Sequence, residues 1–407
     1  MSSKSQLKAI NEILNIDEVI VTNYQKIDEI GCVIYLQKKE AEAACPSCGK
    51  LTNKLHQNHW LTVRDLPLGE HHVYLKINRR QLKCKGCDKK FSEEFTFVKK
   101  RSHFTERLKH KIVEEVLCGD IKNVAQRNRL SEQEAMTIIQ EAGENLVNKK
   151  PENLVRLGID EIAFIKGQKN YCAVLVDIDK KQIIAILPNR TQEEIRKCLE
   201  SWGEEVLSQV EEVSIDLFSS YKSLANELMP NAEVVGDRFH VMKQVSEELD
   251  RQRRKIKREA EKIKNPAEKK SKLAALTHSK YALLKNEIDL NELQRTKLSE
   301  IEKIMPELSA MHKLKESFRK IFESEQNWAD GLFELCVWCK DAQLKFPDSC
   351  GTIRRWMGEI ISYFDNRTTQ GVVEGINNKL KLIKRMGYGF RNFENFRLRV
   401  MLTWHFN

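Results

Sequence analysis

One acidic residue stands at the head of a strongly basic segment near the C-terminus of this 407-residue chain. Four cations follow Glu374 within about three helical turns, and apolar residues recur at the spacing of one helix face. An enzyme that acts on a phosphate backbone through a metal ion needs cations to hold the polyanion and a carboxylate to hold the metal. A solvated basic helix with one stray glutamate is the alternative interpretation. The cations are Lys379, Lys381, Lys384 and Arg385.

Two upstream aspartates favour the catalytic interpretation. Asp160 and Asp216 each end a short run of apolar and β-branched residues. The pattern from 157 to 237 predicts three strands, a helix, a strand, a helix and a strand, which is the order of an RNase H-like fold. In that order Asp160 and Asp216 lie on adjacent parallel strands, and a late helix brings Glu374 beside them. A single aspartate is usually a turn or cap residue, but three acids at these points of the topology indicate a site.

Two Cys-x2-Cys pairs near the N-terminus predict a zinc-binding ribbon. Each pair encloses turn residues, so each short loop can place two thiolates on one tetrahedral ion. A disulfide framework is the competing interpretation. The sequence shows no signal peptide and its other seven cysteines are scattered, which favours a reducing compartment. The four ligands expected for one structural zinc ion are Cys45, Cys48, Cys84 and Cys87.

A helix-turn-helix is predicted directly after the ribbon. Residues 121–130 and 131–139 form two short helical patterns around a tight turn, and Ser131 with Glu134 makes a capping box for the second. We expect residues 131–140 to be the recognition helix. That helix is acidic, so we expect DNA contacts to come from neighbouring cations and from the helix N-terminus. The cations expected to contact DNA in this half of the chain are Arg79, Arg80, Arg127 and Arg129.

The pattern of residues 241–361 predicts a long helical insertion between Asp216 and Glu374. Lys, Glu, Leu and Ala dominate, strand-like alternation is missing, and three prolines divide the segment into several helices. The basic run 251–258 is either a solvated helix face or an arm that contacts phosphates. A third Cys-x2-Cys pair here lacks a partner pair, so we expect Cys336 and Cys339 to be buried helix cysteines. The prolines are Pro266, Pro306 and Pro347.

The composition agrees with a DNA-directed protein. The chain is long enough for two or three domains, and its net charge of +10 fits a polyanionic partner without identifying it. No apolar run approaches the ~20 residues of a membrane span. Residues 149–153 are the expected linker between the DNA-reading and catalytic parts.

Along essentially its whole length the chain resembles the bacterial insertion-sequence transposases of the ISL-three family. The matching motifs run from Cys45-Pro-Ser-Cys48 through Val63-Arg-Asp-Leu-Pro67, Gly158-Ile-Asp160-Glu161, Ser214-Ile-Asp216, Gly236-Asp-Arg-Phe-His240 and Val373-Glu-Gly-Ile-Asn-Asn378 to Gly387-Tyr-Gly-Phe-Arg-Asn392.

The resemblance implies an Asp-Asp-Glu triad at Asp160, Asp216 and Glu374, which holds two magnesium or manganese ions. Asp237 and His240 lie at the next strand end and are candidates to support this site, although an aspartate and a histidine at a helix start often serve only capping and packing. The implied substrates are double-stranded terminal inverted repeats and target DNA. At least two copies of the chain are expected on the DNA, in the bacterial cytoplasm and at the nucleoid.

The resulting fold class is multidomain α+β, with a zinc ribbon, a helix-turn-helix and an RNase H-like α/β core interrupted by a helical insertion. Two other functions compete with transposition. A DNA-binding regulator, or a decayed transposase, would use the N-terminal modules without catalysis, and a structure-selective nuclease would hydrolyse strands without joining them. The expected segments are an N-terminal segment 1–40, the ribbon 41–100, the helix-turn-helix 101–150, the core 151–240, the insertion 241–362 and the end of the core 363–407.

Overall fold

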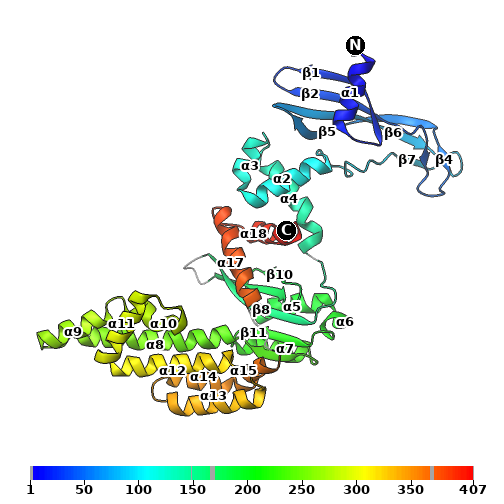
Figure 1. Cartoon of the computed structure of the whole chain (residues 1–407). Helices are drawn as coiled ribbons and strands as arrows, with labels where there is room; N and C mark the ends of the chain where they lie inside the picture. Colours follow the sequence, from blue (N-terminus) through cyan, green and yellow to red (C-terminus); the bar gives the residue numbers. More distant parts are fainter. Residues whose placement is uncertain (1–2, 148, 166–169, 367–370, 407) are drawn as a thin grey trace. The chain divides into compact units, whose positions relative to one another are not determined.

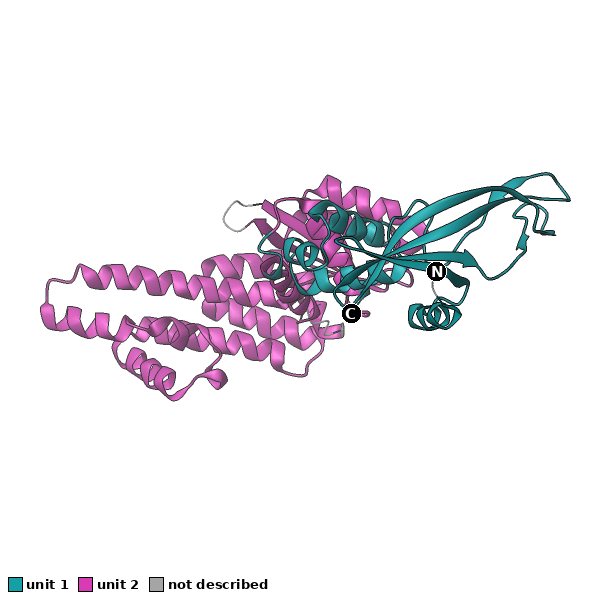
Figure 2. Ribbon diagram, turned by 90° about the horizontal axis from the view of Figure 1, so that it is seen from above, with its two compact units in different colours: residues 1–146, 386–389, 405–407 teal, residues 147–385, 390–404 magenta. Residues whose placement is uncertain are grey.

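The computed structural model describes residues 3–147, 149–165, 170–366 and 371–406. The chain divides into two compact units, which Figure 2 colours separately. Unit 1 comprises residues 1–146, 386–389 and 405–407, and unit 2 comprises residues 147–385 and 390–404. Among the described helices, none is both long and apolar enough to cross a membrane.

A twisted sheet forms the body of unit 1 (Figure 1). Its strand order is β1-β2-β6-β5, with β2 and β6 parallel, the other neighbours antiparallel, and β7 paired to β6. Apolar residues alternate along these strands and bury one face, against which helix α1 packs. Residues 1–40 therefore contribute to the same sheet as the ribbon segment. The elements are α1 (Lys4–Leu14), β1 (Val19–Ile27), β2 (Gly31–Lys38), β5 (Leu55–Leu68), β6 (His71–Lys83) and β7 (Lys90–Ser92).

The two cysteine knuckles lie at one end of this sheet. The small antiparallel pair β3 (Ala43–Ala44) and β4 (Leu51–Thr52) carries the first knuckle, and the turn between β6 and β7 carries the second. Glu93 is almost fully buried beside them and forms an ion pair with Arg80.

Three helices complete the N-terminal part of unit 1: α2 (Glu106–Cys118), α3 (Ile121–Arg127) and α4 (Glu132–Val147). The predicted capping box is present, since Glu134 N donates to Ser131 Oγ at 3.1 Å and Ser131 N donates to Glu134 Oε2 at 2.8 Å. Helix α4 extends beyond residue 140, where we expected the recognition helix to end. The apolar side chains expected between the two helices are buried, and they are Val124, Ala125, Leu130, Ala135, Ile138 and Ile139.

Unit 2 is built on a mixed sheet with strand order β10-β9-β8-β11-β12. Strands β10, β9 and β8 are antiparallel, whereas β8, β11 and β12 are parallel. Helices follow the third and fourth strands in the predicted order. The elements are β8 (Arg156–Ile165), β9 (Asn170–Asp177), β10 (Gln182–Leu187), α5 (Gln192–Trp202), α6 (Glu204–Leu207), β11 (Glu212–Ile215), α7 (Ser219–Leu228) and β12 (Glu233–Gly236).

The insertion is helical, as the composition predicted, and its core is continuous with that of the sheet. Prolines begin three of its helices, because proline lacks the N–H that a first helical residue leaves unpaired. Cys339 is buried as expected, but Cys336 is exposed, so the expectation was wrong for that residue. The elements are α8 (Arg238–Glu261), α9 (Pro266–Leu276), α10 (Ser279–Leu284), η1 (Glu287–Asp289), α11 (Glu292–Ile304), α12 (Pro306–Glu323), α13 (Trp328–Ala342), α14 (Pro347–Arg355), α15 (Met357–Ile361) and α16 (Tyr363–Asn366).

The chain returns to the sheet through α17 (Gly371–Met386) and ends with α18 (Phe393–His405). Helix α17 is amphipathic and buries Val373, Ile376, Leu380 and Ile383. A Cβ atom built on Gly158 would lie 3.2 Å from Val373 Cγ2. Helix α17 therefore packs closely on β8, and a side chain at position 158 would need Val373 to shift slightly.

Candidate active site and zinc centre

Two aspartates meet in unit 2 at the point where the parallel pairing of β8 with β11 ends. Asp216 directly follows β11, whose last residue Ile215 pairs with Ile159. Asp160 lies in the middle of β8, so the prediction that it ends its strand was wrong, because β8 continues to Ile165 in antiparallel pairing with β9. Because Ile159 and Ile215 are register partners on parallel strands, the residue that follows each of them carries its carboxylate to the same place. Asp160 is buried, and the Asp216 side chain is 18% exposed.

A third aspartate follows the next parallel strand, β12, and a histidine lies in the first turn of helix α8. Asp237 follows β12 and caps α8, accepting a hydrogen bond from Phe239 N at 2.9 Å, while its other oxygen lies 2.5 Å from His240 Nδ1. His240 Nδ1 is also 3.3 Å from Asp216 Oδ1. Ligand atoms of Asp160, Asp216 and His240 all lie within 4.8 Å of one another. Asp237 therefore both caps the helix and orients the imidazole.

Burial raises the pKa of both central carboxyl groups. Burial, reinforced by the charge of Asp160, raises the pKa of Asp216 to about 7. Burial alone would lower the pKa of His240, but its hydrogen bond to Asp237 and the nearby carboxylates raise it. Two carboxylates this close are stable in the ionised form only beside a compensating cation.

The donor set fits a hard divalent cation. Among the described residues, the buried Asp216 Oδ1 and Asn377 Oδ1 have no hydrogen-bond partner; the 3.3 Å contact of Asp216 with His240 meets only the distance for an ion pair. Carboxylate and amide oxygens are the ligands that magnesium and manganese prefer. Asp216 and Asn377 therefore each offer a buried oxygen atom that a metal ion could satisfy. Both oxygens of Asp160 already accept hydrogen bonds, from Glu161 N and Asn377 Nδ2, so Asp160 would bind a metal through a lone pair that these bonds leave free.

Glu374 stands apart from this cluster. It is exposed on α17, one turn before Asn377, whose Nδ2 donates to Asp160 Oδ2. Among the described residues, the group spaced for a metal contains Asp160, Asp216 and His240, and it does not include Glu374. Glu374 instead lines an adjacent cavity of about 500 Å³, as does Asp237. Its predicted role as the third carboxylate stays a prediction.

The structure adds two residues to which the sequence assigned no role. Asn377 holds Asp160, and its spacing of three from Glu374 places both on one helix face, which was the available signal. Glu161 follows Asp160 and points to the other side of β8, where Tyr221 donates to it at 2.8 Å and Arg190 forms an ion pair at 2.5 Å. This pair of contacts fixes the strand that carries Asp160.

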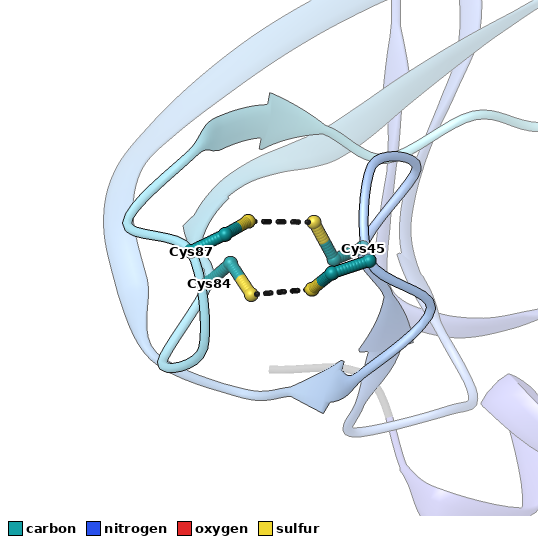
Figure 3. Close-up of side chains that lie close together, drawn as sticks. Cys45, Cys84 and Cys87 are labelled. Carbon is teal, nitrogen blue, oxygen red and sulfur yellow. Dashed lines mark hydrogen bonds between the residues drawn. The ribbon is translucent and has the colours of Figure 1, made fainter.

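The four predicted zinc ligands come together in unit 1 (Figure 3). The Sγ atoms of Cys45 and Cys87 are 3.6 Å apart, and those of Cys48 and Cys84 are 3.5 Å apart. Tetrahedral zinc with bonds of about 2.3 Å separates its sulfur ligands by ~3.8 Å. Hydrogen bonds from the backbone N–H groups of Gly86 and Cys87 lower the pKa of Cys84 to about 6, which favours the thiolate that zinc requires. The geometry thus fits one zinc ion.

The predicted DNA-contacting cations have different environments. Arg79 and Arg80 are bound by Glu93, Lys384 donates to Ala163 O, and Lys379 lies 4.3 Å from the centre of the Trp404 ring, so these four have structural contacts. Arg127 has a longer ion pair of 3.9 Å with Glu115. Arg129, Lys381 and Arg385 are exposed.

Comparisons with known proteins identify three segments. Residues 157–400 match a transposase family model of the ISL3 group, residues 41–87 match the zinc finger of transposases IS204/IS1001/IS1096/IS1165, and residues 93–143 match the helix-turn-helix domain of transposase family ISL3. The chain is 26% identical over 375 residues to the transposase for insertion sequence element IS1001 of Bordetella parapertussis, covering 90% of each chain. It is 30% identical over 268 residues to the transposase for IS1557 of Mycobacterium tuberculosis, covering 62% of this chain and 60% of that protein.

Proposed function

Because the chain belongs to the ISL-three (ISL3) family of insertion-sequence transposases, we propose that it is an Asp-Asp-Glu polynucleotidyl transferase. In this proposal the mixed sheet of unit 2 is an RNase H-like core. The substrates are the terminal inverted repeats of its element and a target duplex, and the reactions are strand cleavage and strand transfer. The observation that carries the proposal is the close pair of buried Asp160 and part-buried Asp216, with a buried Asp216 oxygen that lacks a hydrogen-bond partner.

Each proposed reaction exchanges one phosphorus–oxygen bond for another. In cleavage, a water oxygen bonds to the phosphorus at the repeat end and the bond to the 3′ oxygen breaks, which leaves a 3′ hydroxyl on the element. In strand transfer, that hydroxyl loses its proton and bonds to a target phosphorus, and a target 3′ oxygen leaves. Two magnesium or manganese ions would supply an activated nucleophile and would stabilise charge on the leaving oxygen.

Named residues of this chain have separate tasks. Asp160 and Asp216 are the proposed ligands from the sheet, and Glu374 is the proposed third ligand from α17. Asn377 holds Asp160 through its amide, and Asp237 holds His240 at 2.5 Å. His240 lies 3.3 Å from Asp216 Oδ1 and positions that carboxylate. We expect loss of His240 to weaken metal binding more than DNA binding.

DNA binding is assigned to several elements. The helix-turn-helix would bind the inverted repeats, with Arg127 and Arg129 beside its turn, and the zinc ion would hold the ribbon. Lys381 and Arg385 would contact phosphates near the catalytic site. Joining two ends needs at least two subunits, so a homo-oligomer on nucleoid DNA is part of the proposal.

The test is cleavage of DNA that carries the repeats flanking the gene of this protein. We expect magnesium-dependent nicks at the repeat ends, followed by joined products on a second duplex. Asp216→Asn should bind the repeats and reduce cutting by at least about a thousandfold, because it removes a metal ligand. Glu334→Gln, which neutralises an exposed carboxylate on α13, is the matched control and should cut normally.

The possible outcomes separate the competing functions. Specific binding without cutting by the wild-type protein, in magnesium or manganese, would contradict the proposal and support a DNA-binding regulator or a decayed transposase. Hydrolysis without joined products would support a nuclease instead.

A further inference from the structure

The sheet of unit 1 has one covered face and one open face. Val63, Leu75 and Leu36 point to the covered face, where α1 packs. Side chains alternate along a strand, so the intervening positions of β2, β5 and β6 point to the other side. In the described segments 33–37, 60–64 and 72–78, these intervening positions contain no carboxylate.

An aromatic and cationic cluster occupies the middle of the open face. The ring centres of Tyr35 and Trp60 are 6.3 Å apart in an edge-to-face arrangement. Lys76 Nζ lies 5.3 Å from the centre of the Tyr35 ring and 5.8 Å from that of Trp60. Trp60 is 54% exposed. Among the described residues, Lys76 has no carboxylate partner, so its charge is available to an external anion.

The open face is continuous with the helix-turn-helix. Arg64 is four residues after Trp60 on β5. Because side chains alternate along a strand, both point to the same face. Its guanidinium donates to Arg129 O at 2.9 Å and to Asn128 O, in the turn between α3 and α4. Arg64 also contacts His72 Nδ1 at 3.1 Å, and burial and the charges of Arg64 and Arg129 lower the pKa of this histidine. The turn is thus fixed to the edge of the open face.

We propose that the open face of this sheet binds duplex DNA, beside the segment that the helix-turn-helix contacts. Lys76 contacts a backbone phosphate, Trp60 and Tyr35 pack against sugars, and Thr62 and Asn78 offer hydrogen bonds to the backbone. The absence of carboxylates on this face and its continuity with a DNA-binding motif favour DNA over an acidic or neutral protein surface. The inference rests on the proposed function only in requiring that the protein binds DNA.

The test compares full-length wild-type protein with Lys76→Ala and with Lys76→Ala/Trp60→Ala. Fluorescence anisotropy gives dissociation constants at several salt concentrations for the repeat DNA, an unrelated duplex and a single strand. Lys8→Ala on α1, on the covered side of the sheet, controls for the lost charge, and Trp328→Ala in unit 2 controls for the lost exposed indole. Circular dichroism confirms that each variant is folded.

We expect the double variant to bind both duplexes roughly tenfold more weakly. Lys76→Ala should reduce the slope of log K against log salt by about 0.9, which corresponds to one lost phosphate contact. Duplex trimmed to the helix-turn-helix site should be bound equally by wild type and variants.

Unchanged duplex affinity and slope in folded variants would overturn the proposal, as would an effect confined to single strands. The unrelated duplex separates this result from failure of the transposase proposal, because the slope can be measured even where repeat-specific binding or cutting is missing.

Discussion

Asp216 links the proposed metal site to the stability of the folded protein. A carboxyl group whose pKa is about 7 in the folded state and near 3.8 when unfolded binds its proton more tightly when folded. The protonated Asp216 carboxyl group therefore adds its full contribution to the free energy of unfolding below pH 3.8, the pKa of the unfolded state. This contribution is lost as the pH rises through about 7. A difference of this size corresponds to at most ~4 kcal/mol. The raised pKa values of Asp160 and His240 act in the same direction.

We therefore predict that metal-free protein melts at a lower temperature at pH 7.5 than at pH 5.5. Calcium or magnesium should recover the loss, because either ion binds the ionised carboxylates. Asp216→Asn should flatten the pH dependence, whereas the exposed-site variant Glu334→Gln should keep it. Calorimetry in EDTA and in calcium measures each case. Two results would contradict the assignment of a metal site to these aspartates. One is a wild-type melting temperature that rises from pH 5.5 to pH 7.5, and the other is a melting temperature that calcium and magnesium leave unchanged.

At the scale of elements, we expect the two cysteine knuckles of unit 1 to be held together by one zinc ion, which would join segments far apart in the sequence. Cys45 and Cys48 are separated from Cys84 and Cys87 by the long β5–β6 hairpin, so one ion closes a large loop. We predict one zinc ion per chain by elemental analysis. Cys84→Ser should lose the zinc and expose the hairpin to protease, whereas Cys118→Ser, which alters an exposed thiol on α2, should retain it. Full zinc content in Cys84→Ser would exclude this site.

Local signals predicted many of the elements. The aspartate after β11, the capping box at Ser131 and the prolines that divide the insertion act within a few residues, so the sequence alone reveals them. Asp160 is different, because the pairing of β8 with β9 extends that strand beyond it. The pairing of strands that are far apart in the sequence has no such local signal. The parallel pairing of β2 with β6 joins residues 31–38 to the ribbon segment, and nothing in either strand marks its partner. Likewise, helical spacing places Glu374 and Asn377 on one face, but only tertiary packing decides which of them contacts Asp160.

At the scale of the whole molecule, the helical insertion and the mixed sheet form one folding unit. Their buried side chains belong to a single cluster that extends from Leu157 on β8 to Phe364 on α16. Unit 1 has a separate core around Leu75 and Ile77. Elements whose side chains are buried in one core unfold together. Because the two units have separate cores, we expect two thermal unfolding transitions rather than one.

Two substitutions used above should move these transitions independently. Cys84→Ser removes a zinc ligand from unit 1 and should lower one transition by several degrees, because metal binding is coupled to folding of the ribbon. Asp216→Asn removes a buried ionised carboxylate from unit 2 and should raise the other transition in metal-free buffer at pH 7.5. Differential scanning calorimetry of the full-length protein resolves both. A single transition that responds to both substitutions would mean that the units unfold together, and that the zinc site contributes to the stability of unit 2.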